Sequence, residues 1–563
     1  MTTTISIAEL AAAKARIKEL EARFLTTTIG EFCHKRAAEL GDTPFLEVFD
    51  RGETATYAQA DRASNGIANA LAGLGIGRGD RVAVMLPNRI LYPFVFLALA
   101  KLGAIHVPVN TRYTPREIAY VTGDSSAAAL IIDPAHLDTL AAVEDRDRLP
   151  SMARTLVPDG KARPGMIDFD ALAVEASDAA PFDPGIGPDD LMNIQYTSGT
   201  TGFPKGCMLS HDYWMVLAQS AAGWDAEPIS RLMTAQPFFY MDPQWHVLKT
   251  MVLGGTLFIA PQLSSSRFIG WVKQYGIEWC QFPILMTRQP EEPDDGSTAL
   301  RQVATFGWDG ETCRAFKRRF GVRAREGFGM TEIGLGTLMP ASLEAMYDSG
   351  SVGIDGPFRE TTIRNEDGRV VLPGQRGELW VRGRGLLNGY WNRADADAEA
   401  FRDADDIGLR WFRTGDLFEA DEDGFLWLVG RLKDMIRRSS ENIAAREVEA
   451  VIRQLPQVED CAAVPVPDVK RGEEVKLYVQ LKPGLSPTDL PPEAILVHAR
   501  KGLAAFKVPR FYTYVDSFPR TVSNKIEKRN LLAGADDLRA DAWDAEISAS
   551  LDDREASASR VGF

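Results

Sequence analysis

A run of eleven residues, 196–206, gathers small hydroxyl side chains, glycines and a single lysine in the order YTSGTTGFPKG. Glycine lets a backbone approach a ligand closely, and successive N–H groups in such a turn form a concavity that binds anions. The run therefore predicts a phosphate-binding loop that follows a strand over 191–196, although its composition is equally typical of a polar surface turn. The candidate phosphate-binding residues are Thr197, Ser198, Gly199, Thr200, Thr201, Gly202 and Lys205.

This loop differs from the P-loop of nucleoside triphosphatases. The P-loop places glycine directly before Lys-Ser/Thr, whereas here Pro204 precedes Lys205 and Gly206 follows it. The prediction of a phosphate site therefore depends on what accompanies the loop further along the chain.

Four more stretches carry residue types suited to binding a nucleotide. They are 326–332 (EGFGMTE), 414–417 (TGDL), 430–436 (GRLKDMI) and 519–525 (PRTVSNK). An aromatic side chain such as Phe328 can stack on a purine, while Thr331 and Glu332 can reach phosphate and metal. Mg²⁺ is bound by a few carboxylates together with phosphate oxygens, which fits the single Glu332.

Taken in order, the glycine-rich run and these four stretches resemble the motifs of the adenylate-forming superfamily, which includes acyl-CoA synthetases, firefly luciferase and the adenylation domains of peptide synthetases. The resemblance extends from about residue 50 to residue 532, and five ordered motifs are more specific than any one alone. It implies that Lys525 holds carboxylate and α-phosphate together, that Glu332 binds Mg²⁺ and that Lys433 is the hinge of a mobile lid. The catalytic residues that it implies are Thr197, Glu332 and Lys525. The further nucleotide-binding residues that it implies are Asp309, Gly310, Phe328, Gly329, Met330, Thr331, Asp416 and Arg431.

The expected acyl pocket departs from the family pattern. Tyr240 stands where the family often has histidine, and 305–310 (TFGWDG) replaces a turn of small residues. Tyr240, Trp245 and Trp308 would line an aromatic box, in which each cation–π contact contributes about 0.5–2 kcal/mol. Residues 237–289 also resemble the carnitine/crotonobetaine CoA ligase branch, which favours a short, cationic acid. The alternative is that these aromatic side chains only make apolar contact with the acyl group.

The loop expected to line the coenzyme A tunnel is altered as well. The family usually has Gly-Gly-Glu-Asn, and this chain has Ser439, Ser440, Glu441 and Asn442. Because paired glycines allow close backbone approach, the thioester half-reaction is the one in question. Asn524 replaces glycine in the lysine motif, where asparagine tolerates left-handed dihedrals better than most residues.

The elements that must position these residues alternate between strand and helix. Apolar strands are predicted over 81–87, 105–109 and 128–133, and a helix over 91–102. Such βαβ alternation predicts parallel sheets with helices on their faces. We therefore expect an α/β protein whose large N-terminal domain, 1–430, has several subdomains and mostly parallel sheets sandwiched by helices. A small α+β lid is expected over 431–534, followed over 535–563 by a flexible acidic tail with a short helix at 541–545.

Composition excludes several classes of protein. A net charge of −15 argues against general binding of nucleic acid or of an anionic membrane. No stretch approaches the ~18 consecutive apolar residues of a membrane span. Five scattered cysteines without metal-ligand spacing are typical of reduced thiols in the cytoplasm. The expected partners are a carboxylic acid, ATP and coenzyme A, and a homodimer is compatible with the sequence.

These features together predict an ATP-dependent carboxylic acid–CoA ligase. ATP, Mg²⁺ and the acid would form an acyl-adenylate and pyrophosphate, and the thiol of coenzyme A would then expel AMP. Two alternatives stay open: an adenylate-forming enzyme with a different acceptor, such as a carrier-protein thiol, and a nucleotide-binding protein without turnover. Against the second alternative, the charged residues of the motifs are all present, namely Lys205, Glu332, Asp416, Arg431 and Lys525.

Overall fold

The structure is a computed structural model that describes residues 5–181, 185–197, 204–224, 228–404, 408–438, 441–503, 505–520, 525–533 and 537–546. The chain divides into two units. The first comprises 1–362, 380–413 and 421–427, and the second comprises 363–379, 414–420 and 428–563.

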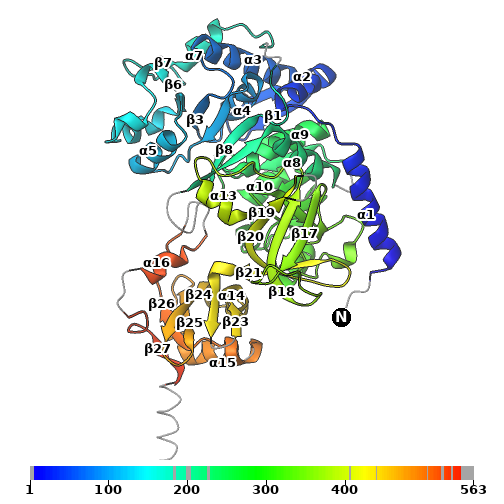
Figure 1. Ribbon diagram of the computed structural model, residues 1–563, viewed down its shortest axis with the longest axis vertical. Coiled ribbons are helices and arrows are strands. Elements are labelled where there is room, and N and C mark those ends of the chain that lie inside the picture. Colours follow the sequence, from blue (N-terminus) through cyan, green and yellow to red (C-terminus); the bar gives the residue numbers. More distant parts are fainter. Residues whose placement is uncertain are drawn as a thin grey trace, which may run out of the picture. The chain divides into compact units, whose positions relative to one another are not determined.

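A seven-stranded sheet in the first unit contains the predicted βαβ alternation (Figure 1). Its order is β7-β6-β5-β3-β4-β8-β9, and neighbouring strands are parallel except β8 and β9, which form a hairpin. Helix α4 (Leu91–Leu102) links β3 to β4 and ends at Gly103, whose φ of 69° is left-handed. The parallel sheet predicted from the sequence is confirmed. The strands are β3 (Arg81–Met85), β4 (Ile105–Pro108), β5 (Ala129–Ile132), β6 (Thr155–Val157), β7 (Ile167–Asp168), β8 (Leu191–Thr197) and β9 (Lys205–Ser210).

A nine-stranded sheet, also in the first unit, has the order β16-β15-β14-β13-β12-β10-β11-β1-β2. Its central strands are parallel, while β2, β15 and β16 pair antiparallel with their neighbours. Its strands are β1 (Pro44–Val48), β2 (Glu53–Thr56), β10 (Arg231–Thr234), β11 (Thr256–Ile259), β12 (Trp279–Gln281), β13 (Gln302–Thr305), β14 (Ala324–Met330), β15 (Gly334–Leu338) and β16 (Ile354–Asp355). A further, five-stranded sheet consists of β17 (Arg359–Arg364), β18 (Arg376–Gly383), β19 (Phe401–Ala404), β20 (Arg410–Ala420) and β21 (Leu426–Arg431).

Local sequence signals set the starts of several helices in the first unit. A capping box opens four of them: a Ser or Thr side chain accepts from the N3 amide, and a Glu or Gln at N3 accepts from the N-cap amide. These boxes are Ser6–Glu9, Thr28–Glu31, Thr56–Gln59 and Thr114–Glu117. Besides α4, the helices of this unit are α1 (Ile7–Ala22), α2 (Ile29–Leu40), α3 (Tyr57–Gly73), α5 (Pro115–Asp124), α6 (Leu137–Ala141), α7 (Phe169–Glu175), α8 (His211–Gly223), α9 (Met241–Leu253), α10 (Phe268–Gln274), α11 (Ile284–Thr287), α12 (Gly310–Phe320) and α13 (Ala394–Ala400). The capping boxes open α1, α2, α3 and α5.

The second unit contains a six-stranded sheet of order β23-β22-β25-β26-β27, with β24 paired to β25. Helices α14 and α15 pack against one another beside a core that includes Val448, Leu477 and Ile495. The predicted small α+β domain is confirmed. Its elements are β22 (Met435–Arg438), β23 (Glu441–Ala444), α14 (Ala445–Ile452), β24 (Val458–Asp468), β25 (Gly472–Leu481), α15 (Pro492–Gly502), β26 (Phe511–Tyr514), α16 (Lys528–Leu532) and β27 (Trp543–Asp544).

Residues 537–546, here called the C-terminal strap, differ from the flexible tail that we expected. Strand β27 pairs antiparallel with β26 where a short helix was predicted. The fully buried Lys476 donates to the Leu538 carbonyl at 2.6 Å and to Asp541 Oδ1 at 2.6 Å. The acidic composition that suggested a solvated tail instead supplies partners for cations of the second unit.

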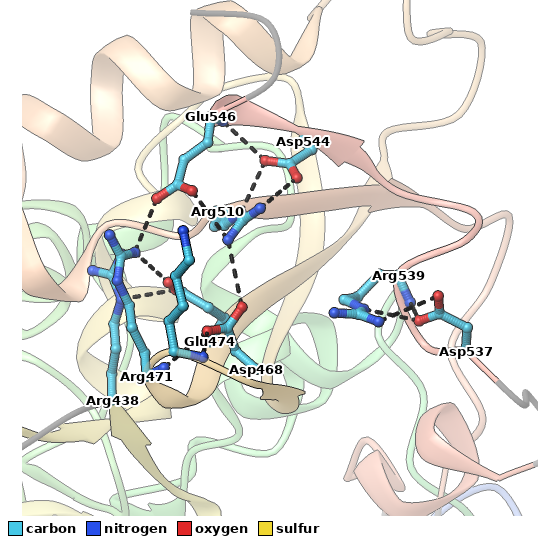
Figure 2. A network of polar contacts seen from close by, with 10 residues as sticks. Arg438, Asp468, Arg471, Glu474, Arg510, Asp537, Arg539, Asp544 and Glu546 are labelled. Atoms are coloured by element: carbon cyan, nitrogen blue, oxygen red, sulfur yellow. Dashed lines mark hydrogen bonds and ion pairs between the residues drawn. The ribbon is translucent and has the colours of Figure 1, made fainter. Parts of the chain in front are cut away.

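Arginine side chains complete the attachment of the C-terminal strap. Arg510 donates to both carboxylate oxygens of Asp544, at 3.0 and 2.9 Å. Figure 2 shows Arg510 lying among Asp468, Asp544 and Glu546, with Arg471 between Glu474 and Glu546. Ion pairs therefore join the strap to the strands of the six-stranded sheet.

In the described part of the chain, no helix combines the length and apolar character needed to cross a membrane. The five cysteines are all buried free thiols.

Candidate active site

The phosphate loop predicted from the sequence joins the two strands of the β8–β9 hairpin. Thr197 pairs with Lys205 in the antiparallel register, and Thr197 Oγ1 donates to the Lys205 carbonyl at 3.4 Å. The Tyr120 hydroxyl donates to the Pro204 carbonyl at 3.0 Å, which fixes the end of the loop. The sequence predicted β8 but missed β9. Ser198, Gly199, Thr200, Thr201 and Gly202 lie outside the described residues.

The end of β14, in the nine-stranded sheet, carries the predicted metal-binding glutamate. Glu332 follows β14 and is 8% exposed. The Tyr390 hydroxyl donates to Glu332 Oε1 at 3.1 Å, and Lys205 Nζ lies 4.6 Å from the centroid of the same tyrosine ring. The hairpin lysine and the strand-end carboxylate are therefore brought to one aromatic side chain. Burial and the Glu332 charge raise the pKa of Tyr390, so its phenol stays protonated as a donor.

The motif that contains Glu332 forms a tight β14–β15 hairpin. A side chain at Gly329 would place its Cβ 2.5 Å from the Gly334 carbonyl oxygen, so only glycine fits there. The fully buried Tyr213 donates its hydroxyl to the Thr331 carbonyl at 2.8 Å. Phe328 is 8% exposed, and Met330 and Thr331 are partly buried. The contacts that we predicted for these residues with adenine and phosphate remain predictions.

Asp309 and Gly310 have a local structural function. The Asp309 side chain caps α12 by accepting from the Thr312 amide at 2.7 Å. A Cβ at Gly310 would lie 2.2 Å from the Asp348 carbonyl oxygen. These contacts account for the residue types at both positions, and binding of nucleotide by either residue remains a prediction.

The three aromatic residues predicted to line the acyl pocket lie in different surroundings. Tyr240 is the N-cap of α9, and Trp245 lies one turn into this helix, which the sequence analysis did not predict. The Trp308 ring packs in the apolar core with its centroid 5.3 Å from that of Phe316 and 6.1 Å from that of Phe282. Tyr240 and Trp245 therefore share one helix start, whereas the contacts described for Trp308 are those of a core residue.

The start of α9 also carries a polar group. Asp242 accepts from Trp245 Nε1 at 3.3 Å and from Gln281 Nε2 at 3.3 Å. Burial raises the pKa of Tyr240 to about 12, and nearby Arg112 lowers it. Tyr240 therefore offers a neutral hydroxyl rather than the titratable ring of a histidine.

Two buried glutamines, which the sequence analysis missed, fix the segment before α9. Gln244 Nε2 donates to the Phe238 and Tyr240 carbonyls, each at 3.0 Å, and Gln195 Nε2 donates to the Phe239 carbonyl at 2.8 Å. Three successive carbonyls thus bind two side-chain amides, one from β8 and one from α9. Gln195 lies in a strand that is otherwise mostly apolar and buried, and that polar residue is the signal that could have identified it.

The second unit contains the residues predicted to bind ribose. Arg431 Nε lies 2.8 Å from Asp416 Oδ1, and the Asp416 side chain is 4% exposed while that of Arg431 is 48% exposed. Gly415 has a left-handed φ of 71°, and its amide donates to Glu378 Oε1 at 3.1 Å. The TGD motif therefore lies within strand β20, where a left-handed glycine precedes a buried carboxylate that pairs with an accessible guanidinium.

The remaining predicted residues also belong to the second unit. The hinge residue Lys433 has its backbone in a 3-10 turn, Leu432–Asp434, and its side chain is not described. Ser439 and Ser440 lie outside the described residues, and Glu441 and Asn442 begin β23. The Lys525 side chain is exposed.

Comparisons with known proteins agree with this organisation. Residues 33–391 match the family model of AMP-binding enzymes, and residues 447–525 match that of the AMP-binding enzyme C-terminal domain. A feruloyl-CoA synthase from an Amycolatopsis species is 32% identical over 499 residues, which cover 86% of this chain and 95% of that protein. A crotonobetaine/carnitine–CoA ligase from Salmonella arizonae is 31% identical over 491 residues, covering 84% and 92%.

A solved structure shows the same fold. ATP-bound MatB from Rhodopseudomonas palustris superposes with a TM-score of 0.78 at 26% identity, covering 90% of this chain and 98% of that one. The motif order, the fold and these relatives confirm the predicted superfamily. The chain belongs to the family of AMP-binding enzymes, and it is an AMP-forming carboxylic acid–CoA ligase that acts through an acyl-adenylate.

Proposed function

We propose that this ligase activates a compact carboxylic acid whose far end donates a hydrogen bond or carries a positive charge. The proposal is supported by Asp242, which lies three residues before Trp245 and accepts from its indole nitrogen at 3.3 Å. A carboxylate beside an aromatic ring favours a cation or a hydroxyl donor over a plain hydrocarbon chain. Gln281 donates its side-chain Nε2 to Asp242. Its side-chain oxygen, Oε1, is buried and has no hydrogen-bond partner among the described residues. It offers an acceptor for the same donor.

The observation that carries the adenylation chemistry is the contact of both Lys205 and Glu332 with Tyr390, the lysine at its ring and the glutamate at its hydroxyl. A lysine at the end of a glycine-rich loop suits the phosphates of ATP, and a carboxylate beside it suits their counter-ion. In our proposal a carboxylate oxygen of the acid attacks the α-phosphorus, and the bond from that phosphorus to pyrophosphate breaks. Lys525 would hold the two anions together during this step, since the repulsion between their like charges raises the barrier.

The residues present fit a magnesium ion. Among the described residues, no cluster of three or more His, Cys, Asp or Glu side chains could bind a metal. A site based on Glu332 would therefore supply one carboxylate, with phosphate oxygens and water completing the shell, as Mg²⁺ prefers beside nucleotides. When bound, the ion offsets the charge of the phosphates.

The second half-reaction would use the second unit as a lid. We propose that residues 431–534 rotate about Lys433, after which the coenzyme A thiol attacks the acyl carbon and AMP leaves. The serine pair 439–440, with Glu441 and Asn442, would line the path of the thiol. The buried free thiols support a reducing compartment such as the cytoplasm.

Whether the enzyme acts as a homodimer would be measured by light scattering.

The test is a panel of acids with ATP and Mg²⁺, with and without coenzyme A. The panel contains short aliphatic, long-chain, hydroxylated aromatic and quaternary-ammonium acids, and pyrophosphate and thioester are measured separately. We expect both products from hydroxylated or cationic acids and little from long-chain acids. Asp242→Asn should reduce that preference, while Tyr57→Phe, which changes a buried tyrosine bonded to the Thr250 and Gly255 carbonyls, should not.

Each other outcome has a distinct meaning. Preference for long-chain acids would contradict the proposed substrate class. Pyrophosphate without thioester would point to a different acceptor, as the altered serine loop allows. If calorimetry shows that ATP binds but no acid of the panel yields pyrophosphate or thioester, the proposed substrate class is wrong.

A further inference from the structure

Tyr390 contacts both charged residues that the proposed function assigns to the phosphates and their counter-ion, Lys205 and Glu332. Its hydroxyl donates to Glu332 Oε1 at 3.1 Å, and the Lys205 ammonium lies 4.6 Å from its ring centroid. The tyrosine is 5% exposed. We propose that Tyr390 is a positioning residue for adenylation, which orients the Glu332 carboxylate through its hydroxyl and the Lys205 ammonium through its ring. This inference rests on the proposed functions of Lys205 and Glu332.

The backbone around Tyr390 is fixed against the phosphate hairpin. Residues 388–391 run antiparallel to β9: the Met208 amide donates to the Gly389 carbonyl at 2.9 Å, and the Trp391 amide donates to the Gly206 carbonyl at 2.8 Å. Tyr390 and Cys207 form the bridge between these contacts. The tyrosine therefore moves with the strand that begins at Lys205.

The same segment is tied to the Glu332 backbone. The Leu387 amide donates to the Glu332 carbonyl at 2.9 Å. The segment 387–391 is thus hydrogen-bonded both to β9, which begins at Lys205, and to the Glu332 backbone. The Lys205 and Glu332 side chains are therefore both held close to the Tyr390 side chain.

A glycine and an aspartate set the direction of the tyrosine. Gly389 has a φ of 142°, and a Cβ there would lie 2.7 Å from Asp397 Oδ2. The other oxygen, Asp397 Oδ1, accepts from the Tyr390 amide at 2.8 Å. This arrangement requires glycine at 389 and leaves the tyrosine side chain pointing to Glu332.

The chemistry explains why a tyrosine is needed. A phenol is a neutral donor, so it binds one carboxylate oxygen without cancelling the charge that a metal would use. The ring face attracts an ammonium through its quadrupole without donating or accepting a proton. A lysine or an aspartate at 390 would instead pair directly with one of the two groups.

The test separates the hydroxyl from the ring. Tyr390→Phe removes only the bond to Glu332, and Tyr390→Leu removes the ring as well. The first assay is ATP–pyrophosphate exchange with varied Mg²⁺. We expect Tyr390→Phe to lower kcat/KM for ATP about 10-fold and to raise the Mg²⁺ requirement, because a hydrogen bond to a charged group is lost. Tyr390→Leu should lower it further.

A second assay measures binding without turnover. Calorimetry with a non-hydrolysable ATP analogue, with and without Mn²⁺, should show weaker metal-dependent binding in Tyr390→Phe and unchanged metal-free binding. Tyr390→Leu should weaken both. Thioester formation from a supplied acyl-adenylate should stay within about 2-fold of wild type in Tyr390→Phe, because that half-reaction releases no pyrophosphate.

Two controls show whether the losses in the Tyr390 variants come from the contact with Glu332. Tyr57→Phe loses a buried hydroxyl bonded to carbonyls elsewhere and should change neither assay. In the Glu332→Gln background, Tyr390→Phe should cause no further loss of metal-dependent binding. Wild-type behaviour of Tyr390→Phe in both assays, or equal losses in both half-reactions with a lowered Tm, would overturn the positioning role. A wild-type enzyme that exchanges pyrophosphate with no acid would contradict the proposed function instead, and the binding assay would still decide on Tyr390.

Discussion

Polar groups are used differently in the two units. Around the β8–β9 hairpin of the first unit, segments are fixed by buried neutral groups, such as the Gln195 and Gln244 amides and the Tyr213 hydroxyl. In the second unit, the C-terminal strap is held largely by ion pairs, which range from that of the buried Lys476 to that of Arg471 with Glu546, whose side chains are 37% and 49% exposed. The buried hydrogen bonds of the first unit fix the positions of individual backbone carbonyls. The ion pairs of the second unit attach the C-terminal strap to the six-stranded sheet.

This difference has an energetic consequence. Removing one partner of a buried hydrogen bond leaves the other desolvated at a cost of about 1–3 kcal/mol, whereas exposed ion pairs typically contribute about 0–1 kcal/mol and weaken in salt. We therefore expect the site in the first unit to be sensitive to single atoms. The second unit should tolerate most changes except at Lys525 and at the buried Lys476.

The largest effect tests chemistry in the otherwise tolerant second unit. Lys525→Ala should reduce adenylate formation about 10³-fold, because the cation between two anions is lost. Thioester formation from supplied acyl-adenylate should remain near wild type, as measured by stopped-flow. Lys482→Ala, also an exposed lysine of this unit, is the matched control. Equal loss of both half-reactions would contradict the assigned role of Lys525.

Removal of the C-terminal strap is expected to have the next largest effect. Deletion of residues 537–563 removes both partners of the Lys476 ammonium, the Leu538 carbonyl and Asp541. Because the lysine is buried whereas the Asp541 side chain is 59% exposed, we expect a loss at or below the about 3–5 kcal/mol of a broken buried pair. Urea unfolding should show this loss. Deletion of 548–563 alone retains the strap and serves as the control.

A compensating change sharpens this test. Lys476→Met in the shortened chain removes the uncompensated charge at similar volume and should restore much of the lost stability. If the shortened chain unfolds like the full chain, the strap does not stabilise the second unit.

Gln244→Leu tests the buried amides of the first unit. It removes the donors to the Phe238 and Tyr240 carbonyls and should lower the free energy of unfolding by about 2 kcal/mol. The KM for the acid should rise, since the segment before Tyr240 loses its support. Gln219→Leu is the control, because its amide bonds to Leu25 at an exposed position. Equal losses in the two variants would remove the distinction between buried and exposed amides.

The smallest effect is expected at an exposed pair of the C-terminal strap. Arg539→Ala breaks the contact with Asp537, whose side chain is 51% exposed. We expect no measurable change in Tm, in low or in high salt. A loss of stability as large as that expected for Gln244→Leu would show that exposed ion pairs stabilise the second unit as much as buried hydrogen bonds stabilise the first.

Features that depend on neighbouring residues could be predicted from the amino-acid sequence. Helix α4 has the predicted bounds, 91–102, because its apolar run ends at a glycine that adopts the left-handed conformation. The parallel strands followed from the alternation of strand and helix, and the motifs identified the family. Signals of this kind are local, so they are readable without a structure.

Contacts between residues far apart along the chain could be identified only from the fold. Tyr390 contacts a carboxylate 58 residues away, Gln244 meets Gln195 across 49 residues, and Lys476 reaches Asp541 across 65. Such pairs leave no periodic trace, because each partner is a single polar residue in a segment whose own pattern is unremarkable. The hairpin strand β9 was missed for a related reason, since six residues of mixed polarity do not show that they pair with β8. Burial, which converts these lone polar groups into fixed contacts, is a property of the whole fold.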